Sequence, residues 1–184
     1  MSSTDYVRTD DPELQSRVRS RYAKDIEALA RLGFRTLCTC VEQLGPYSAI
    51  LRLPMMLLML GFREVLLIRP PLRVAAGSLL MTHPDPPTVA LPMGMGVKFY
   101  SGFSDGSVLV TTSFQSYAVP RPASPIEKQV VLLGGLPGAW RGHCDRVNAR
   151  IADGKVLETQ LTFEAYVDLS RREENPDAYT TKIG

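Results

Sequence analysis

The central part of the chain, residues 47–81, is its most hydrophobic stretch, and arginine side chains interrupt it at short intervals. Its longest charge-free run is Leu53 to Phe62, ten residues, whereas a transmembrane helix needs about 20 consecutive apolar residues. Arg63 and Glu64 follow that run directly, and a charge at the bilayer centre costs on the order of 3 kcal/mol. The sequence therefore disfavours a membrane-spanning helix, so the apolar side chains of this stretch must pack against something other than the interior of a bilayer.

Three interpretations of the stretch remain open. In the first, Pro54–Leu60 is a helix and Glu64–Leu72 a strand, both buried in the core, with methionines filling irregular gaps. In the second, the stretch lies on an anionic membrane surface, because four arginines against one glutamate give it a local charge of +3. In the third, it forms an adaptable groove for a partner protein. The expected binding residues are Arg52, Met55, Met56, Met59, Arg63, Arg69 and Arg73.

Charge and cysteine content narrow the class of protein. The chain has 21 basic and 19 acidic residues, a net charge of +2, so we expect no nucleic-acid partner. Its three cysteines are poor material for a disulfide framework. The first residues contain no apolar run that would resemble a signal peptide. We therefore expect a cytoplasmic protein, associated with the membrane if the second interpretation holds.

An N-terminal helix is predicted between Asp11 and Gly33. Asp11 is a good N-cap, Pro12 suits the first helical position, and Gly33 ends the periodic pattern. The basic residues of this helix are balanced by acidic ones, which favours a solvated face over a nucleic-acid patch. A strand, Phe34–Val41, is expected to follow.

A β-hairpin is predicted around Asp105-Gly106, taken as a two-residue turn. That turn places Phe103 opposite Val108 and Phe99 opposite Thr112. The resulting alternation predicts one buried sheet face and one wetter face. The run Lys98–Ser107 looks like hairpins of bacterial proteins, a likeness that is short and implies no activity.

The C-terminal third is predicted to add a strand and helices. Gln129–Leu133 is a short apolar, β-branched run, and the glycine-rich residues after it lead to a helix that ends at Gly154. Its apolar stripe would consist of Trp140, Cys144, Val147 and Ile151. Residues 157–172 fit both a strand and a helix, and we favour a helix.

Together these elements predict an α+β fold. We expect an antiparallel sheet centred on the 97–114 hairpin, packed by two or three helices. The predicted organisation is a disordered N-terminus at 1–10, a single domain at 11–172 and a polar tail at 173–184.

Few residues suggest chemistry. Cys38, Cys40, Cys144, His143 and His83 are the candidate metal ligands, but their spacing matches no common zinc motif. A pairing of His143 with Cys38 or Cys40 across the fold is conceivable as a nucleophile and its base. We expect no metal, no cofactor and no catalytic residue.

The two glycine-dense segments give little support to phosphate binding, and a tight turn with a helix start is the favoured interpretation of the second. Gly94–Gly96 and Gly134–Gly138 do not match the phosphate-binding loop, which needs Gly-Lys-Ser/Thr. The second precedes a predicted helix, whose free N–H groups could hold an anion, but a tight turn is favoured. Acidic residues that could act as acid or base read as solvated faces; these are Asp145, Asp153, Glu158 and Glu164.

The sequence thus favours a non-catalytic binding or accessory protein that uses the arginine-edged apolar stretch at 49–73. Its partner would be a protein or an anionic membrane surface. The alternative is an α+β domain with a pocket for an apolar small molecule, with or without an enzymatic activity. The aromatic residues expected to line that pocket are Phe99, Phe103, Phe114 and Trp140.

Overall fold

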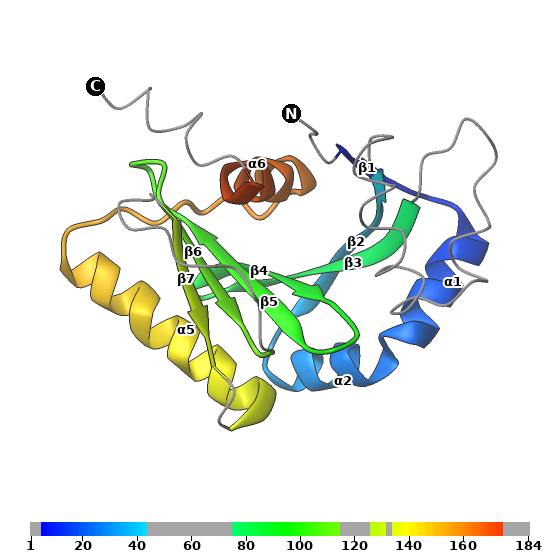
Figure 1. The fold of residues 1–184 in the computed structure, drawn as a ribbon, viewed down its shortest axis with the longest axis horizontal. Coiled ribbons are helices and arrows are strands. Elements are labelled where there is room, and N and C mark those ends of the chain that lie inside the picture. The colour runs from blue at the N-terminus through cyan, green and yellow to red at the C-terminus, as the bar shows by residue number, and fades with distance from the viewer. Residues whose placement is uncertain (1–4, 44–74, 115–125, 132–133, 175–184) are drawn as a thin grey trace.

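A seven-stranded sheet with helices on both faces forms the structure (Figure 1). The computed structural model describes residues 5–43, 75–114, 126–131 and 134–174. The strands are β1 (Asp5–Arg8), β2 (Arg35–Gln43), β3 (Ala75–Pro84), β4 (Pro87–Pro92), β5 (Val97–Gly102), β6 (Val108–Thr112) and β7 (Ile126–Val130). The helices are α1 (Pro12–Arg21), α2 (Ala23–Arg31), α5 (Gly135–Ala152) and α6 (Phe163–Glu174). The predicted α+β class is confirmed.

Neighbouring strands follow chain order from β1 to β7. All adjacent pairs are antiparallel except β6 and β7, which run parallel. The hairpin of β5 and β6 therefore lies inside the sheet, with β1 to β4 on one side and β7 on the other. A parallel pair needs a long connection, and residues 113–125 supply it.

The sheet separates two hydrophobic clusters. On one face, Tyr166 and Leu169 of α6 pack against strand residues that include Tyr100 and Val110. On the other face, α1, α2 and α5 contribute Val18, Leu29 and Ala139 to a second cluster. Figure 1 shows α6 on one side of the sheet and the other three helices opposite. Both faces of β5 and β6 are therefore buried, and the predicted wetter face is wrong.

The predicted hairpin register is also wrong, by one residue. Tyr100 lies opposite Val110 and Phe99 opposite Thr111. Phe103 N donates to Ser107 O at 2.9 Å, and Gly106 N donates to Phe103 O at 2.8 Å. These bonds enclose a three-residue loop in which Gly106 has a φ of +81°, and such loops place the last residue in the left-handed region. The extra loop residue shifts every pair of the hairpin by one position. Relative to β5, the side chains of β6 therefore point to the opposite face of the sheet from the one predicted.

The N-terminal helix begins as predicted but is broken. Asp11 caps α1, because its carboxylate accepts from Glu13 N at 2.9 Å and from Leu14 N at 3.3 Å. Tyr22, with φ −98° and ψ 16°, interrupts the helix and lets α2 start in a new direction. Gly33 ends α2 with a φ of +92°, and β2 follows.

Regular secondary structure extends beyond the predicted domain at both ends. Residues 1–10 were expected to be disordered, but Asp5–Arg8 form β1 and pair with β2. The Tyr6 ring packs edge-on against Tyr166 at 5.3 Å between centroids, which anchors this short strand. At the other end α6 continues to Glu174, two residues into the expected tail. The single-domain assignment itself stays a prediction.

The remaining C-terminal predictions hold in part. β7 begins at Ile126, three residues before the predicted strand, and ends at Val130. α5 ends at Ala152 and Gly154 follows with a φ of +84°, as expected. Residues 163–174 are helical, whereas Leu157 makes an isolated bridge with Phe103.

Candidate functional site

The predicted binding residues lie outside the described part of the structure. These are Arg52, Met55, Met56, Met59, Arg63, Arg69 and Arg73. The structure does define where their segment leaves and rejoins the fold. Gln43, the last residue of β2, pairs with Ala75, the first residue of β3. The two ends of the segment 44–74 are therefore direct neighbours on adjacent strands.

His143 is the polar centre of the α5 side of the sheet. It is fully buried on the inner face of α5, with no exposed surface. Its Nε2 lies 3.0 Å from Ser101 Oγ on β5, and its Nδ1 lies 2.9 Å from Thr111 Oγ1 on β6. Ser101 Oγ donates to Pro87 O at 3.0 Å. Ser101 therefore accepts from Nε2–H, and Nδ1 accepts from the Thr111 hydroxyl.

This environment keeps the imidazole neutral. Burial, with a smaller contribution from the nearby charge of Arg146, lowers the pKa of His143 to about 3. Thr88 Oγ1 lies 3.0 Å from Ser101 Oγ and extends the network. A neutral, fully hydrogen-bonded histidine without solvent contact stabilises the packing of α5 on the sheet. Its contacts are those of a structural residue.

The cysteines are separated from this histidine. Cys38 and Cys40 are buried in the cluster on the α6 face, whereas His143 lies on the α5 face. The sheet lies between them and excludes the conceivable His–Cys pair. Burial raises the pKa of the Cys38 thiol. Burial and the charge of Asp145 together raise the pKa of the Cys144 thiol to about 11. These thiols are therefore protonated at neutral pH and are weak nucleophiles.

A second polar site lies between α6 and the sheet, and the sequence did not reveal it. Glu173 Oε1 lies 2.9 Å from Lys128 Nζ and 3.3 Å from Lys98 Nζ. The Tyr100 hydroxyl donates to its other oxygen at 2.7 Å. Burial opposes ionisation of Glu173, but the two ammonium groups outweigh it and hold its pKa below the usual value. The partners of Glu173 lie 45 to 75 positions away in the sequence, so no local sequence pattern could predict the site.

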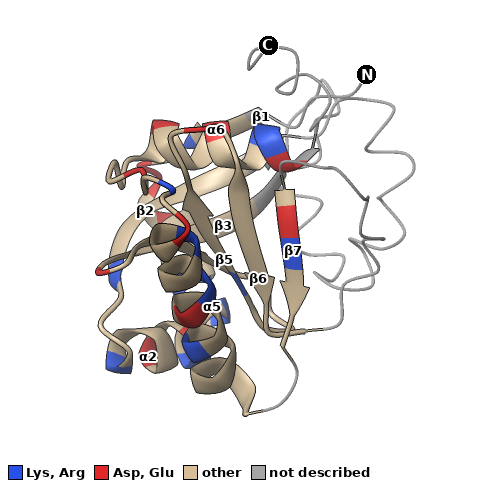
Figure 2. Ribbon diagram, turned by 90° about the vertical axis from the view of Figure 1, so that its left-hand side faces the viewer, with Lys and Arg blue, Asp and Glu red and all other residues tan. Residues whose placement is uncertain are grey.

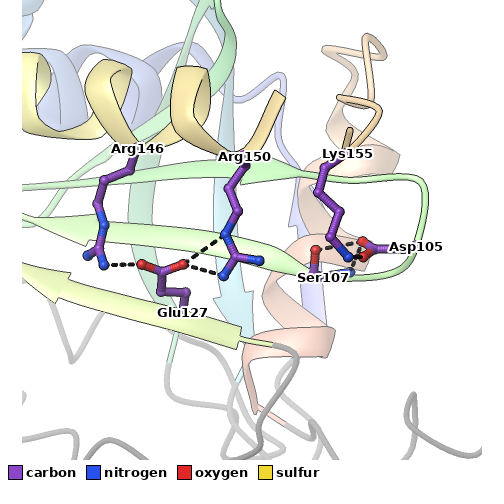
Figure 3. A network of polar contacts seen from close by, with 6 residues as sticks. All are labelled: Asp105, Ser107, Glu127, Arg146, Arg150 and Lys155. Carbon is purple, nitrogen blue, oxygen red and sulfur yellow. Dashed lines mark hydrogen bonds and ion pairs between the residues drawn. The ribbon is translucent and has the colours of Figure 1, made fainter. Parts of the chain in front are cut away.

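Two further ion-pair groups fasten α5 and the loop after it (Figure 3). Arg146 and Arg150, one turn apart on α5, both bind the carboxylate of Glu127 on β7. Lys155 binds Asp105 in the β5–β6 loop, which also accepts from Ser107 Oγ at 2.6 Å. Burial opposes the ionisation of Asp105, but these hydrogen bonds lower its pKa to about 2. Figure 2 shows basic and acidic residues along α5, which lies in front of the sheet in this view.

Neither glycine-dense segment is a phosphate-binding loop, which would join a strand to a helix and carry Lys and Ser or Thr. Gly94–Gly96 belongs to the β4–β5 connection, so it joins two antiparallel strands. Gly134, with a φ of +81°, is the N-cap of α5 and makes no side-chain capping bond. The tight turn and helix start expected at Gly134–Gly138 are confirmed, since α5 begins at Gly135.

The four aromatic residues expected around a small-molecule pocket do not form one cluster. Phe99 packs against Trp140 at 5.4 Å between ring centroids. Phe103 belongs to a separate buried group with Leu109 and Val147. The apolar stripe of α5 is also rotated from the predicted one, because Ala139, His143 and Val147 are its buried residues and Ile151 is exposed.

Among the described residues, no group of three or more His, Cys, Asp or Glu side chains is arranged to hold a metal ion. None of the helices in these residues combines the length and hydrophobicity needed to cross a bilayer.

Comparison with protein-family models, with curated proteins and with solved structures finds no match to this chain.

Proposed function

We propose that this chain is a non-catalytic binding protein that uses its arginine-edged apolar segment, residues 49–73, to dock on an anionic membrane surface. The observation that supports this most is the pairing of Gln43 with Ala75. Two antiparallel neighbours need only about two to five residues to connect them. The segment 44–74 is therefore far longer than the sheet requires.

Long connections between paired strands are usually functional. This one is also the most hydrophobic part of the sequence and carries a local charge of +3. Apolar insertion and attraction to anionic lipid act together at a membrane surface. The same combination offers less to a buried core, where each guanidinium would need a partner.

The buried polar groups of the described fold favour a structural scaffold. His143 and Glu173 are both occupied by hydrogen bonds or ion pairs inside the packed layers. Cys38 and Cys40 belong to the core. These groups hold helices on the sheet, and the segment leaves and rejoins this scaffold at the paired residues Gln43 and Ala75.

Flotation with vesicles tests the proposal. The wild-type protein should float with vesicles containing anionic lipid at low salt, less so at high salt, and little with neutral vesicles. Arg63→Glu should weaken flotation severalfold. Arg141→Glu is the matched control, since it makes the same change of charge on an exposed residue of α5.

Two results would overturn the membrane as partner. One is no flotation of the wild-type protein at low salt. The other is an equal loss of flotation in the Arg63→Glu and Arg141→Glu variants. If the protein instead binds a purified protein, loses that binding in the Arg63→Glu variant and does not float with vesicles, the segment would be assigned to a protein partner.

A further inference from the structure

The β4–β5 loop, Met93–Gly96, carries two exposed methionines. Met93 is 37% exposed and Met95 58% exposed, and these are among the most exposed large apolar side chains of the described residues. The residues on either side, Pro92 and Val97, are buried. The loop therefore presents apolar surface to solvent at the end of a well-packed hairpin.

The loop has a defined shape. Met93 N donates to Gly96 O at 2.8 Å and closes it. Gly94 and Gly96 have φ values of +75° and +148°, which other residues rarely adopt. Ser113 braces the base, because its Oγ accepts from Val97 N at 2.8 Å and its N donates to Val97 O at 3.0 Å. The methionines are thus held outward before any partner binds.

Tyr22, which lies next to this loop, has basic neighbours in the chain. A Cβ placed on Gly94 would lie 3.9 Å from the ring of Tyr22, the residue between α1 and α2. The Arg21 guanidinium lies 5.6 Å from the centre of that ring. Arg19 and Lys24 are exposed within three residues of Tyr22. Asp25, partly buried, is the acidic residue in the same turn, so the local balance is positive.

The loop also lies at the same end of the sheet as Gln43 and Ala75, the residues that flank the proposed membrane segment. β3 is antiparallel to both β2 and β4. The end of β2, the start of β3 and the end of β4 therefore share one end of the sheet. Figure 1 shows the start of β3 and the β4–β5 loop on the side where α1 lies.

We propose that the loop methionines Met93 and Met95 insert into the interface of an anionic bilayer, while Arg19, Arg21 and Lys24 contact its lipid headgroups. This inference rests on the proposed function and adds a second contact to it. A stable protein interface buries about 800 Å² on each partner, which two methionine side chains on a tight loop do not supply. Shallow insertion beside cations suits a lipid surface, where both contributions add.

Methyl NMR of the full-length protein tests this contact directly. The chain contains seven methionines, among them Met55, Met56 and Met59 in the segment and Met81 in the core. Their methyl carbons would be labelled with ¹³C, and Met93→Ser and Met95→Ser would assign the loop signals. The protein is then mixed with anionic bicelles that contain a spin-labelled lipid, which broadens nearby methyl signals.

The loop signals should broaden strongly, while the Met81 signal should not, because Met81 is only 1% exposed. Broadening of the segment signals without the loop signals would overturn the loop contact and leave the proposed function standing. Broadening of the loop signals alone would support the loop contact and overturn the segment as the docking element. No broadening of either would overturn both.

A variant provides the second measurement. Met93→Ser combined with Met95→Ser should lower the ratio of vesicle-bound to free protein by about tenfold, since two apolar side chains lose their burial. Val156→Ser is the matched control, because Val156 is 65% exposed in the loop after α5. Wild-type flotation of the double loop variant would overturn the loop contact.

Discussion

Ser101 Oγ and His143 Nε2 lie 3.0 Å apart, entirely inside the layer between α5 and the sheet. The imidazole links β5 and β6, because its other nitrogen lies 2.9 Å from the Thr111 hydroxyl. α5 is therefore joined to two central strands by a side chain that fits only when neutral. The stability of the α5 side of the molecule must then depend on pH.

The first prediction is a loss of stability in mild acid. The pKa of His143 is about 3 in the folded protein and 6.5 is its ordinary value. Between these values the unfolded chain binds a proton that the folded chain does not, so the free energy of unfolding falls as the pH falls. From pH 6.5 to pH 5 the expected loss from this group is about 2 kcal/mol. Urea unfolding at several pH values measures it.

His143→Gln is the control for this effect. It removes the titrating group, so the loss of stability between pH 6.5 and pH 5 should shrink, although the variant is less stable at pH 7. The pKa values of Asp105 and Glu173 are also lowered in the folded protein, so these carboxylates reduce the free energy of unfolding in the same direction as the pH falls, but at lower pH, around and below their ordinary pKa values of 3.8 and 4.5. The same loss in wild type and variant over this range would show that His143 is not its source.

The sequence predicted the fold class because its main signals are local. The Asp11 cap, the Gly33 and Gly154 stops and the hairpin around Gly106 each depend on a few neighbouring residues. The register of the hairpin could not be predicted, because it depends on whether the loop has two residues or three. Asp105-Gly106 fits both a two-residue and a three-residue loop, and only the hydrogen bonds of Phe103 distinguish them.

The face of α5 could not be predicted because a polar residue occupies it. Hydrophobic periodicity excludes histidine from a buried stripe, yet His143 is buried since Ser101 and Thr111 satisfy both ring nitrogens. Those hydroxyls are 42 and 32 positions away in sequence. The same distance problem hid Glu173, whose partners come from β5 and β7.

The second prediction concerns the carboxylate under α6. Glu173→Gln should destabilise the protein by about 1 to 3 kcal/mol, because Lys98 and Lys128 would remain partly buried without their counter-charge. Glu13→Gln is the matched control, since Glu13 is an exposed partner of Arg17 on α1 and such pairs contribute about 0.3 to 0.5 kcal/mol. Chemical denaturation measures both. Equal effects would contradict a structural role for Glu173.

The third prediction concerns the capping of α1. Asp11→Ala should destabilise the protein by about 1 kcal/mol, because two backbone N–H groups at the start of the helix lose their acceptor. Asp11→Ser should recover most of that loss, since a serine hydroxyl is a comparable cap. Thermal unfolding of the two variants measures the difference. A serine variant no more stable than the alanine variant would argue against the capping bond.

The fourth prediction uses two glycines, one in a strand and one in a helix, that differ in the space around them. A Cβ on Gly77 of β3 would lie 2.5 Å from Val18 Cγ2, a buried side chain of α1, and 3.4 Å from Leu14 Cδ1. Gly77→Ala must therefore push α1 away from the sheet, at a cost of about 1 to 3 kcal/mol.

A Cβ on Gly142, inside α5, meets Val131 at 3.5 Å, an ordinary contact. Gly142→Ala should accordingly stabilise the protein by about 0.5 to 1 kcal/mol, because alanine is the better helix former. Opposite shifts of the unfolding midpoint are expected from one added methyl group, and a stabilising Gly77→Ala would mean that α1 does not pack on β3 as closely as these contacts require.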